Sequence, residues 1–179
     1  MIAHYRQIAR NCDIPLILYN CPGRTAINTT ADTVVALSEE KNIVAIKEAS
    51  GSIDQVCDII CRTDDSFTVL SGDDSLTVPM ISVGGKGVIS VTSNIAPSLM
   101  VQMTNAAIRG DFATAASFHK RLFPLMRTLM KAEVNPSPVK TALNILGREF
   151  GLVRLPLVEP DGAGKEMIES ALKDAGILS

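Results

Sequence analysis

The sequence lacks the patterns that mark membrane-spanning, secreted and nucleic-acid-binding proteins. Glycine, proline or a charged residue interrupts every apolar stretch before it reaches the roughly 20 residues that span a bilayer. No basic flank followed by an apolar block opens the chain. Lysine and arginine form no runs, and the formal net charge is only −2, so no phosphate-tracking surface is expected. These absences predict a cytoplasmic protein that binds neither membranes nor nucleic acids.

Potential metal ligands are also scarce. The only histidines are His4 and His119, and neither stands at a ligand-like spacing from other candidate ligands. The cysteines fit reduced cytosolic thiols better than a disulfide framework, because a chain of this length needs no cross-links to hold its core. They are Cys12, Cys21, Cys57 and Cys61. We therefore expect no metal site.

Hydrophobic residues, in contrast, are abundant and regularly arranged. They make up 46% of the chain, which is ample for a buried core. Short apolar runs alternate with turns and helical patterns, as in successive βα units. Each run is apolar on both faces, which is typical of parallel strands covered by helices. The four predicted strands are residues 14–19, 43–49, 67–71 and 87–92.

Helix start signals separate these runs. Thr30 is placed to cap one helix, while Ser52 followed by Gln55 has the capping-box spacing of another. The opening segment also has a helical pattern, and beyond the fourth run only helices are expected. We predict βα units over residues 1–96, and over residues 97–179 the last helix of these units followed by a C-terminal helical extension, packed as one unit.

In a parallel α/β sheet, functional groups gather where the strands end. This rule singles out Tyr19, Lys47, Gly72 and Ile89. Lys47 is the most unusual, because it lies inside the apolar run IVAIKEAS. An unprotonated, desolvated lysine can attack the carbonyl of a keto acid to form an imine. The alternative is a structural lysine that extends to solvent or pairs with Glu48 or an aspartate.

The motif YNCPGRT follows the first predicted strand. Tyr19 closes the apolar run, and the turn at Pro22 and Gly23 brings Arg24 back over the strand ends. A phenol beside an imine can relay protons, and a guanidinium can hold a carboxylate at two points. The alternative is a tyrosine packed at a strand end and an exposed arginine in a turn.

The motifs YNCPGRT, IKEAS, LSGDD and GVISVTSN occur in an order and spacing that resemble the dihydrodipicolinate synthase family of Schiff-base pyruvate aldolases, in its C-terminal half. The resemblance implies an α/β TIM barrel, with Lys47 forming the imine with pyruvate and Tyr19 transferring protons. It further implies that Arg24 orients the carboxylate of aspartate semialdehyde. Gly72 and Ile89 would line the pyruvate pocket through backbone atoms. The implied reaction gives 4-hydroxy-tetrahydrodipicolinate, in lysine and diaminopimelate biosynthesis, without metal or organic cofactor.

The sequence departs from the family pattern chiefly in length. A TIM barrel takes about 250 residues and eight βα units, whereas four strands are predicted here, which corresponds to a half barrel. The paired threonines that grip the pyruvate carboxylate and the partner-subunit tyrosine of the proton relay have no counterpart. Cys21 is a minor departure, because an aliphatic residue is commoner there.

A half barrel exposes two strand edges and an apolar face. We therefore expect a homo-oligomer, or a complementing N-terminal half, besides the small-molecule substrates. Two other functions stay open: a non-catalytic oligomeric half barrel, and a 2-keto-acid aldolase for another aldehyde. Arg24 argues against the second of these.

Overall fold

The computed structural model describes residues 1–178 and forms two compact units, one from Met1 to Ile89 and one that begins at Ser90. The boundary falls earlier than the predicted one between residues 96 and 97. The reason is the short helix η2 (Thr92–Asn94), which packs against helices of the second unit. That the two parts pack as one unit stays a prediction.

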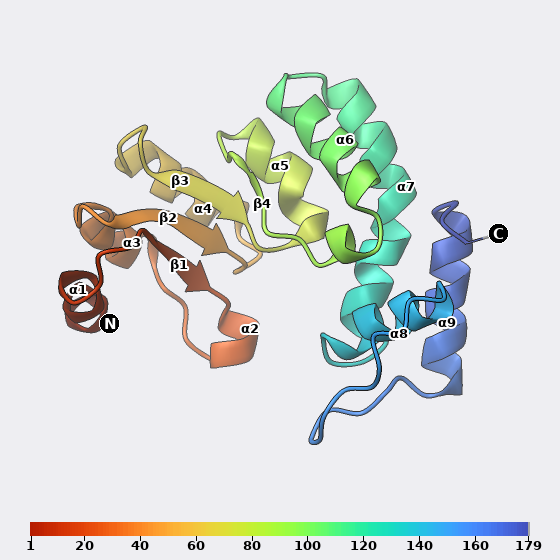
Figure 1. Ribbon diagram of the computed structural model, residues 1–179. Helices are drawn as coiled ribbons and strands as arrows, with labels where there is room; N and C mark the ends of the chain where they lie inside the picture. The colour runs from red at the N-terminus through yellow and green to blue at the C-terminus, as the bar shows by residue number, and fades with distance from the viewer. Residues whose placement is uncertain (179) are drawn as a thin grey trace. The chain divides into compact units, whose positions relative to one another are not determined.

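The first unit is built on one parallel sheet with the strand order β1-β2-β3-β4 (Figure 1). All four predicted strands are present, with somewhat different ends. They are β1 (Leu16–Asn20), β2 (Ile43–Glu48), β3 (Thr68–Ser71) and β4 (Gly87–Val88). Because neighbours in the sheet are also neighbours along the chain, the carboxyl ends of successive strands lie side by side.

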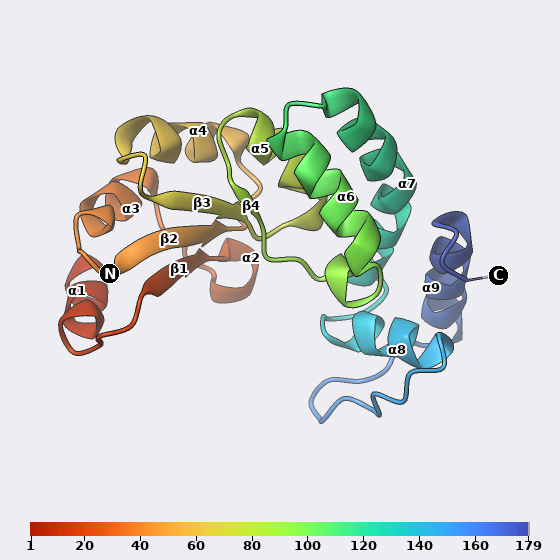
Figure 2. The ribbon, with the colours of Figure 1, turned by 45° about the horizontal axis from the view of Figure 1, so that its top comes forward.

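Helices connect the strands of this unit, and α1, α3, α4 and α5 contribute to its core (Figure 2). The helical elements are α1 (Ile2–Arg10), α2 (Pro22–Thr25), α3 (Ala31–Ser38), α4 (Ile53–Arg62), η1 (Asp74–Leu76) and α5 (Thr77–Ser82). Leu18, Ile46 and Val69 of three adjacent strands are buried against this helical layer. The alternate side chains point to the other face, where Ile17 is 51% exposed. One face of the sheet thus forms the core, and the other is open within this unit.

Two strand ends differ from prediction for local reasons. The first strand begins at Leu16, because Pro15 has no N–H to donate to a neighbouring strand. Ile14 therefore precedes the strand, and its side chain is 65% exposed. The fourth strand ends at Val88 instead of residue 92. There the Ser90 hydroxyl accepts the Ser93 N–H at 2.8 Å, which starts a turn in place of further sheet pairing.

The predicted helix caps at Thr30 and Ser52 are confirmed. The Thr30 hydroxyl accepts the Thr33 N–H at 3.4 Å, and the Ser52 hydroxyl accepts the Gln55 N–H at 3.1 Å. A capping box would also have the Gln55 side chain accept the Ser52 backbone N–H. This part of the prediction is wrong, because the Ser52 N–H donates to the Ser50 hydroxyl. The Gln55 side chain is therefore available for the polar contacts described below.

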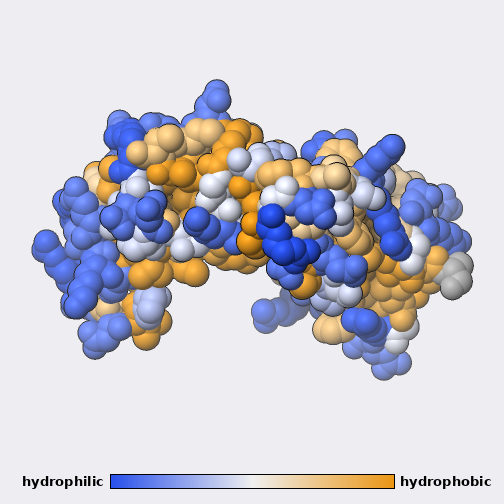
Figure 3. Space-filling view, turned by 90° about the horizontal axis from the view of Figure 1, so that it is seen from above, coloured by the Kyte–Doolittle hydropathy of each residue, from blue (hydrophilic) through white to orange (hydrophobic). Residues whose placement is uncertain are grey.

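The second unit is helical. It contains η2, α6 (Pro97–Ile108), α7 (Phe112–Lys131), α8 (Ser137–Ile145) and α9 (Gly162–Asp174). Leu125, Leu129, Ile168 and Leu172 bring α7 and α9 together in its core. Hydrophobic and hydrophilic side chains are interspersed on the surface of the chain seen in Figure 3. None of the helices in residues 1–178 is long and apolar enough to cross a membrane.

Candidate active site

Tyr19 and Lys47 lie side by side at the ends of β1 and β2. They are register partners in the parallel sheet, and the Lys47 Nζ lies 4.1 Å from the centroid of the Tyr19 ring. Lys47 is half-buried, while Tyr19 is 46% exposed. A lysine ammonium at this distance from a ring face is attracted by the ring electrons. The amine and the phenol predicted to act together are therefore brought together, on the open face of the sheet.

Glu48 does not pair with Lys47, in contrast to one alternative raised by the sequence. Its side chain lies on the opposite face of the sheet, where it is 2% exposed and bound by the amides of Asn20 and Gln55. The alternation of side chains along β2 explains this separation. The Lys47 side chain is consequently directed to the face that carries Tyr19.

Gly72 has a steric role beside Lys47. A Cβ atom at this position would lie 3.1 Å from both Cγ and Cε of Lys47, and 2.8 Å from Cβ of Ala49. The missing side chain thus leaves the space in which the Lys47 alkyl chain runs. The sequence pointed to Gly72 only as a backbone contact for pyruvate, so this reason for a glycine is new.

The backbone N–H groups of Gly72 and Ile89 are already engaged. Gly72 N–H donates to the Glu48 carbonyl at 2.7 Å, and Ile89 N–H donates to the Ser71 carbonyl at 2.9 Å. Any backbone contact with a ligand therefore falls to the carbonyl groups of these two residues. The Ile89 side chain is 39% exposed.

Arg24 lies in the last turn of α2, just beyond the end of β1. Its side chain is exposed, and the helix is capped after Thr25 by Ala26, whose φ of 57° is in the left-handed region. The turn keeps the Arg24 guanidinium near Tyr19, and its positive charge acts to lower the pKa of the Tyr19 phenol. Arg24 is thus available to a carboxylate without first breaking an internal ion pair, as judged from the pairs formed by residues 1–178.

The Tyr19 hydroxyl holds its proton strongly. The pKa of Tyr19 is raised to about 12. Partial burial is the largest cause of this rise, and a hydrogen bond with the Cys21 side chain is the second. The negative charge of Asp73 adds to it, and these effects exceed the lowering by the charge of Arg24. Cys21, a minor departure from the family pattern, is therefore a neighbour of the phenol. At neutral pH the phenol is a proton donor.

Sequence reasoning missed the polar side chains directly behind the site. Asn20 follows Tyr19 and is 1% exposed, and Glu48 follows Lys47. The Asn20 amide donates to Glu48 Oε2 at 2.9 Å. The available signal was the strand register: once Tyr19 faces Lys47, the next residues must also face each other, on the other side of the sheet.

No group of three or more histidine, cysteine, aspartate or glutamate side chains within residues 1–178 is arranged to hold a metal ion. The four cysteines are free thiols. An amine and a phenol meet on the open face of the sheet, and an exposed guanidinium lies in the turn just beyond β1. They suit a carbonyl compound that carries a carboxylate.

Known proteins resemble the chain over nearly its whole length. Residues 1–175 match the Dihydrodipicolinate synthetase family. The chain is 48% identical over 176 residues to the 4-hydroxy-tetrahydrodipicolinate synthase of Methanocaldococcus jannaschii, which covers 98% of this chain and 60% of that protein. It is 46% identical over 179 residues to the enzyme of the same name from Methanosarcina mazei, covering 99% of this chain and 61% of that protein.

Solved structures agree. The lysine-bound dihydrodipicolinate synthase of Cyanidioschyzon merolae superimposes with a TM-score of 0.95 at 40% identity, over 99% of this chain and 60% of that one. A dihydrodipicolinate synthase structure at 47% identity has a TM-score of 0.94, over 99% of this chain and 61% of that one.

The chain spans about 60% of the length of the curated relatives it matches. The four parallel strands and their helices correspond to part of a TIM barrel, which confirms the predicted fold class. With a family match over residues 1–175 and close structural agreement, the chain belongs to the dihydrodipicolinate synthetase family.

Proposed function

We propose that Lys47 forms a Schiff base with pyruvate and that the resulting enamine condenses with aspartate 4-semialdehyde to give 4-hydroxy-tetrahydrodipicolinate. The observation that carries this proposal is the Lys47 amine lying 4.1 Å from the Tyr19 ring centroid on the open face of the sheet. Relatives 46–48% identical to the chain carry the name of that synthase, which supports the choice of substrates.

The chemistry begins when the Lys47 nitrogen attacks C2 of pyruvate. A C–N bond forms, and the carbonyl oxygen leaves as water with the two hydrogens that the amine gives up. Tyr19 transfers protons between nitrogen and oxygen, because its hydroxyl stays protonated at neutral pH. The imine then makes the pyruvate methyl group acidic, and loss of one methyl proton gives an enamine. Its carbon attacks the aldehyde, which forms the new C–C bond while the aldehyde oxygen takes up a proton. The amino group of the semialdehyde portion then attacks the imine carbon, which closes the ring and breaks the bond to the Lys47 nitrogen, so that the amine is released.

Arg24 is proposed to receive the carboxylate of the semialdehyde, since its guanidinium is exposed at the turn after β1. Gly72 and Ile89 are proposed to meet pyruvate through their carbonyl groups. The covalent imine on Lys47 needs no metal or organic cofactor. Cytoplasmic location stays a proposal.

Trapping with borohydride tests this function. The 179-residue chain is incubated with pyruvate, the imine is reduced to a stable amine, and the labelled peptide is mapped by mass spectrometry. We expect the label on the peptide that contains Lys47. Addition of aspartate semialdehyde before reduction should compete with trapping. An unlabelled chain would favour a non-catalytic half barrel.

Substitution Gly72→Ala should slow imine formation without removing any reacting group. The new Cβ meets the Lys47 alkyl chain at 3.1 Å and Ala49 Cβ at 2.8 Å, so the Lys47 side chain must leave its present position beside Tyr19. A misplacement of this kind costs about 10- to 100-fold in rate. The measurement is the trapping rate at saturating borohydride. The control is Gly23→Ala, because a Cβ there meets nothing within 4 Å.

We further propose that copies of the chain associate through the open side of the sheet, or that an N-terminal half complements it. β1 and β4 are the sheet edges, and Ile17 and Ile89 expose 51% and 39% of their surface on the first unit. Size-exclusion chromatography with light scattering should give a mass above the 19.1 kDa of one chain. A folded monomer at micromolar concentration would contradict association.

A further inference from the structure

Four polar side chains form a connected cluster behind Tyr19 and Lys47, on the helix-facing side of the sheet. We call this cluster of Asn20, Asn28, Glu48 and Gln55 the strand-end network. Asn20 and Glu48 are its buried centre, at 1% and 2% exposure. Asn28 and Gln55 connect this centre to the surface.

Glu48 is a buried acidic group bound by three N–H donors. Its Oε2 accepts the Asn20 amide at 2.9 Å and the Gln55 amide at 3.2 Å, and its Oε1 accepts the Ser50 backbone N–H at 2.6 Å. Donors on both oxygens are the pattern that a carboxylate takes. Hydrogen bonds to such a group are stronger than those between neutral groups, which makes the arrangement specific.

The network extends from the two strand ends to the loop after α2. The Asn20 Oδ1 accepts the Thr29 backbone N–H at 2.9 Å, and its Nδ2 also donates to Asn28 Oδ1 at 2.8 Å. Asn28 Nδ2 in turn donates to Gln55 Oε1 at 2.8 Å. One set of hydrogen bonds therefore joins β1, β2, the first turn of α4 and the loop that follows the helix bearing Arg24.

Each buried member of the network is the chain neighbour of a site residue. Tyr19 pairs with Lys47 in the sheet register, and Asn20 pairs with Glu48 at the next position. Successive side chains of a strand point to opposite faces, so a fixed Asn20 orientation also fixes the direction of Tyr19. The same holds for Glu48 and Lys47.

We propose that the strand-end network is a positioning device that holds the Lys47 amine over the Tyr19 ring. Its residues act through Tyr19 and Lys47 and touch no substrate. The effect on imine formation rests on the function proposed above, whereas the effect on the contact between Tyr19 and Lys47 does not. Because the network reaches the loop after α2, it also links the position of Arg24's turn to that of the amine.

Glu48→Gln tests the network with almost no change in shape. Wherever the new NH₂ group lies, it meets an N–H donor: the amides of Asn20 and Gln55 at one position, or the Ser50 N–H at the other. The side-chain amides must then turn away and release their other contacts, or the Ser50 N–H loses its acceptor. We expect the rate of pyruvate trapping on Lys47 to fall by about 10-fold or more.

Leu37→Ala is the control for loss of stability. Leu37 is fully buried in the core of the same unit and belongs to the apolar cluster, outside the network. Both variants are compared at a temperature at which circular dichroism shows them folded. A trapping rate that falls no further in Glu48→Gln than in Leu37→Ala overturns the proposal.

Tyrosine emission gives a second readout that needs no substrate. The chain has no tryptophan and only two tyrosines, so Tyr19 is the sole emitter in a Tyr5→Phe background. We expect Glu48→Gln to change its emission intensity, because the Lys47 amine moves from the ring, and Leu37→Ala to leave it unchanged. Unchanged Tyr19 emission in Glu48→Gln overturns the proposed positioning by the network. A wild type that traps no pyruvate counts only against the proposed function, and the emission test still applies.

Two further variants complete the test. Gln55→Ala removes one donor to Glu48 from a half-exposed position, and replaces Glu48→Gln if the latter does not fold. It should shift trapping and emission in the same direction by a smaller factor.

The double variant Asn20→Asp with Glu48→Gln exchanges carboxylate and amide across the strands. We expect it to recover part of the lost rate, and no recovery counts against positioning by this hydrogen bond.

Discussion

Lys47→Ala should abolish the borohydride-trapped pyruvate adduct completely. The substitution removes the only reacting nitrogen proposed for the imine, and no hydrogen bond of the strand-end network involves this side chain. The fold should therefore survive, because Lys47 is half-buried on the open face and lies outside the apolar core cluster. The measurement is the mass of the reduced protein, with unfolding followed in parallel by circular dichroism.

Matched lysine variants separate specific imine formation from surface labelling. Lys41 and Lys86 belong to the same unit and are exposed, so Lys41→Ala and Lys86→Ala should trap pyruvate as the wild type does. Lys47→Arg keeps a long nitrogen-bearing side chain near Tyr19 but cannot form the imine, so it should be unlabelled. A label that persists in Lys47→Ala, or that spreads over the exposed lysines in the wild type, would overturn the assignment.

Much of the first unit could be predicted from local patterns. Apolar runs located all four strands, and hydroxyl side chains at Thr30 and Ser52 located two helix starts. The end of the fourth strand was missed because Ser90 binds the Ser93 N–H, a competition between side chain and sheet that periodicity does not register.

The site was predicted in part. Strand ends and the family motifs pointed to Tyr19 and Lys47, and the register places these two side by side. The space that Gly72 leaves for the Lys47 chain depends on how neighbouring strands approach, which one sequence does not state. Gln55 was assigned to a capping box, yet its side chain binds Glu48 because a buried acceptor lies within reach.

The strand-end network was not predicted because it depends on contacts between residues far apart in the sequence. Asparagine, glutamine and glutamate are ordinary surface residues, and nothing in their local spacing marks them as buried. Their burial follows from the pairing of Asn20 with Glu48, a contact between residues far apart in the chain. Hydrogen bonds then offset the desolvation of the polar groups.

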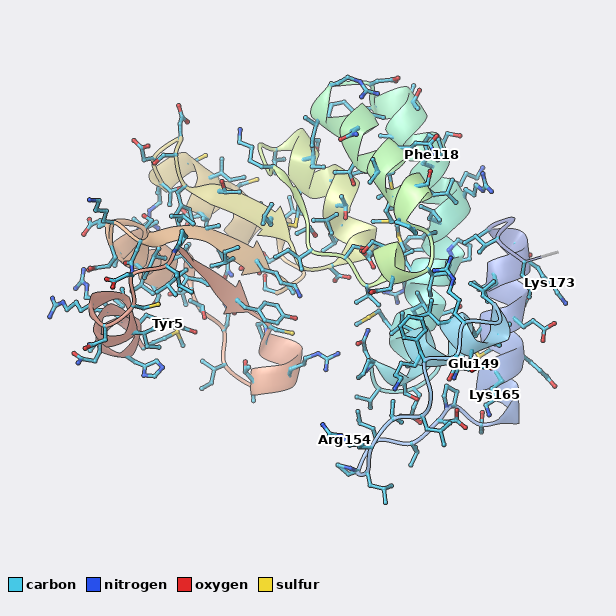
Figure 4. All side chains as sticks on the ribbon, in the orientation of Figure 1. Tyr5, Phe118, Glu149, Arg154, Lys165 and Lys173 are labelled. Carbon is cyan, nitrogen blue, oxygen red and sulfur yellow. The ribbon has the colours of Figure 1, made fainter. Side chains whose placement is uncertain are left out.

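Tyr19→Phe should slow pyruvate trapping by about 100- to 10,000-fold, the usual contribution of a positioned proton donor. The ring and its contact with the Lys47 amine are retained, and only the hydroxyl is lost. Tyr19→Leu removes the ring as well, so any further loss measures the contact itself. Tyr5→Phe is the matched control, because Tyr5 lies on α1, at the other end of the strands from α2 (Figure 4).

The dependence on pH follows from the direction of the pKa shift. The ordinary phenol pKa is 10.0, and burial with the Cys21 contact raises that of Tyr19 to about 12, so the proton donor persists to higher pH than an exposed phenol. Between pH 7 and 10, the ratio of wild-type to Tyr19→Phe trapping rates should therefore stay constant. Cys21→Ala removes one cause of the raised Tyr19 pKa. The pyruvate-trapping rate of this variant should therefore begin to fall at a lower pH than that of the wild type. A ratio that drops by half near pH 8 would show that Tyr19 loses its proton early and is not the donor.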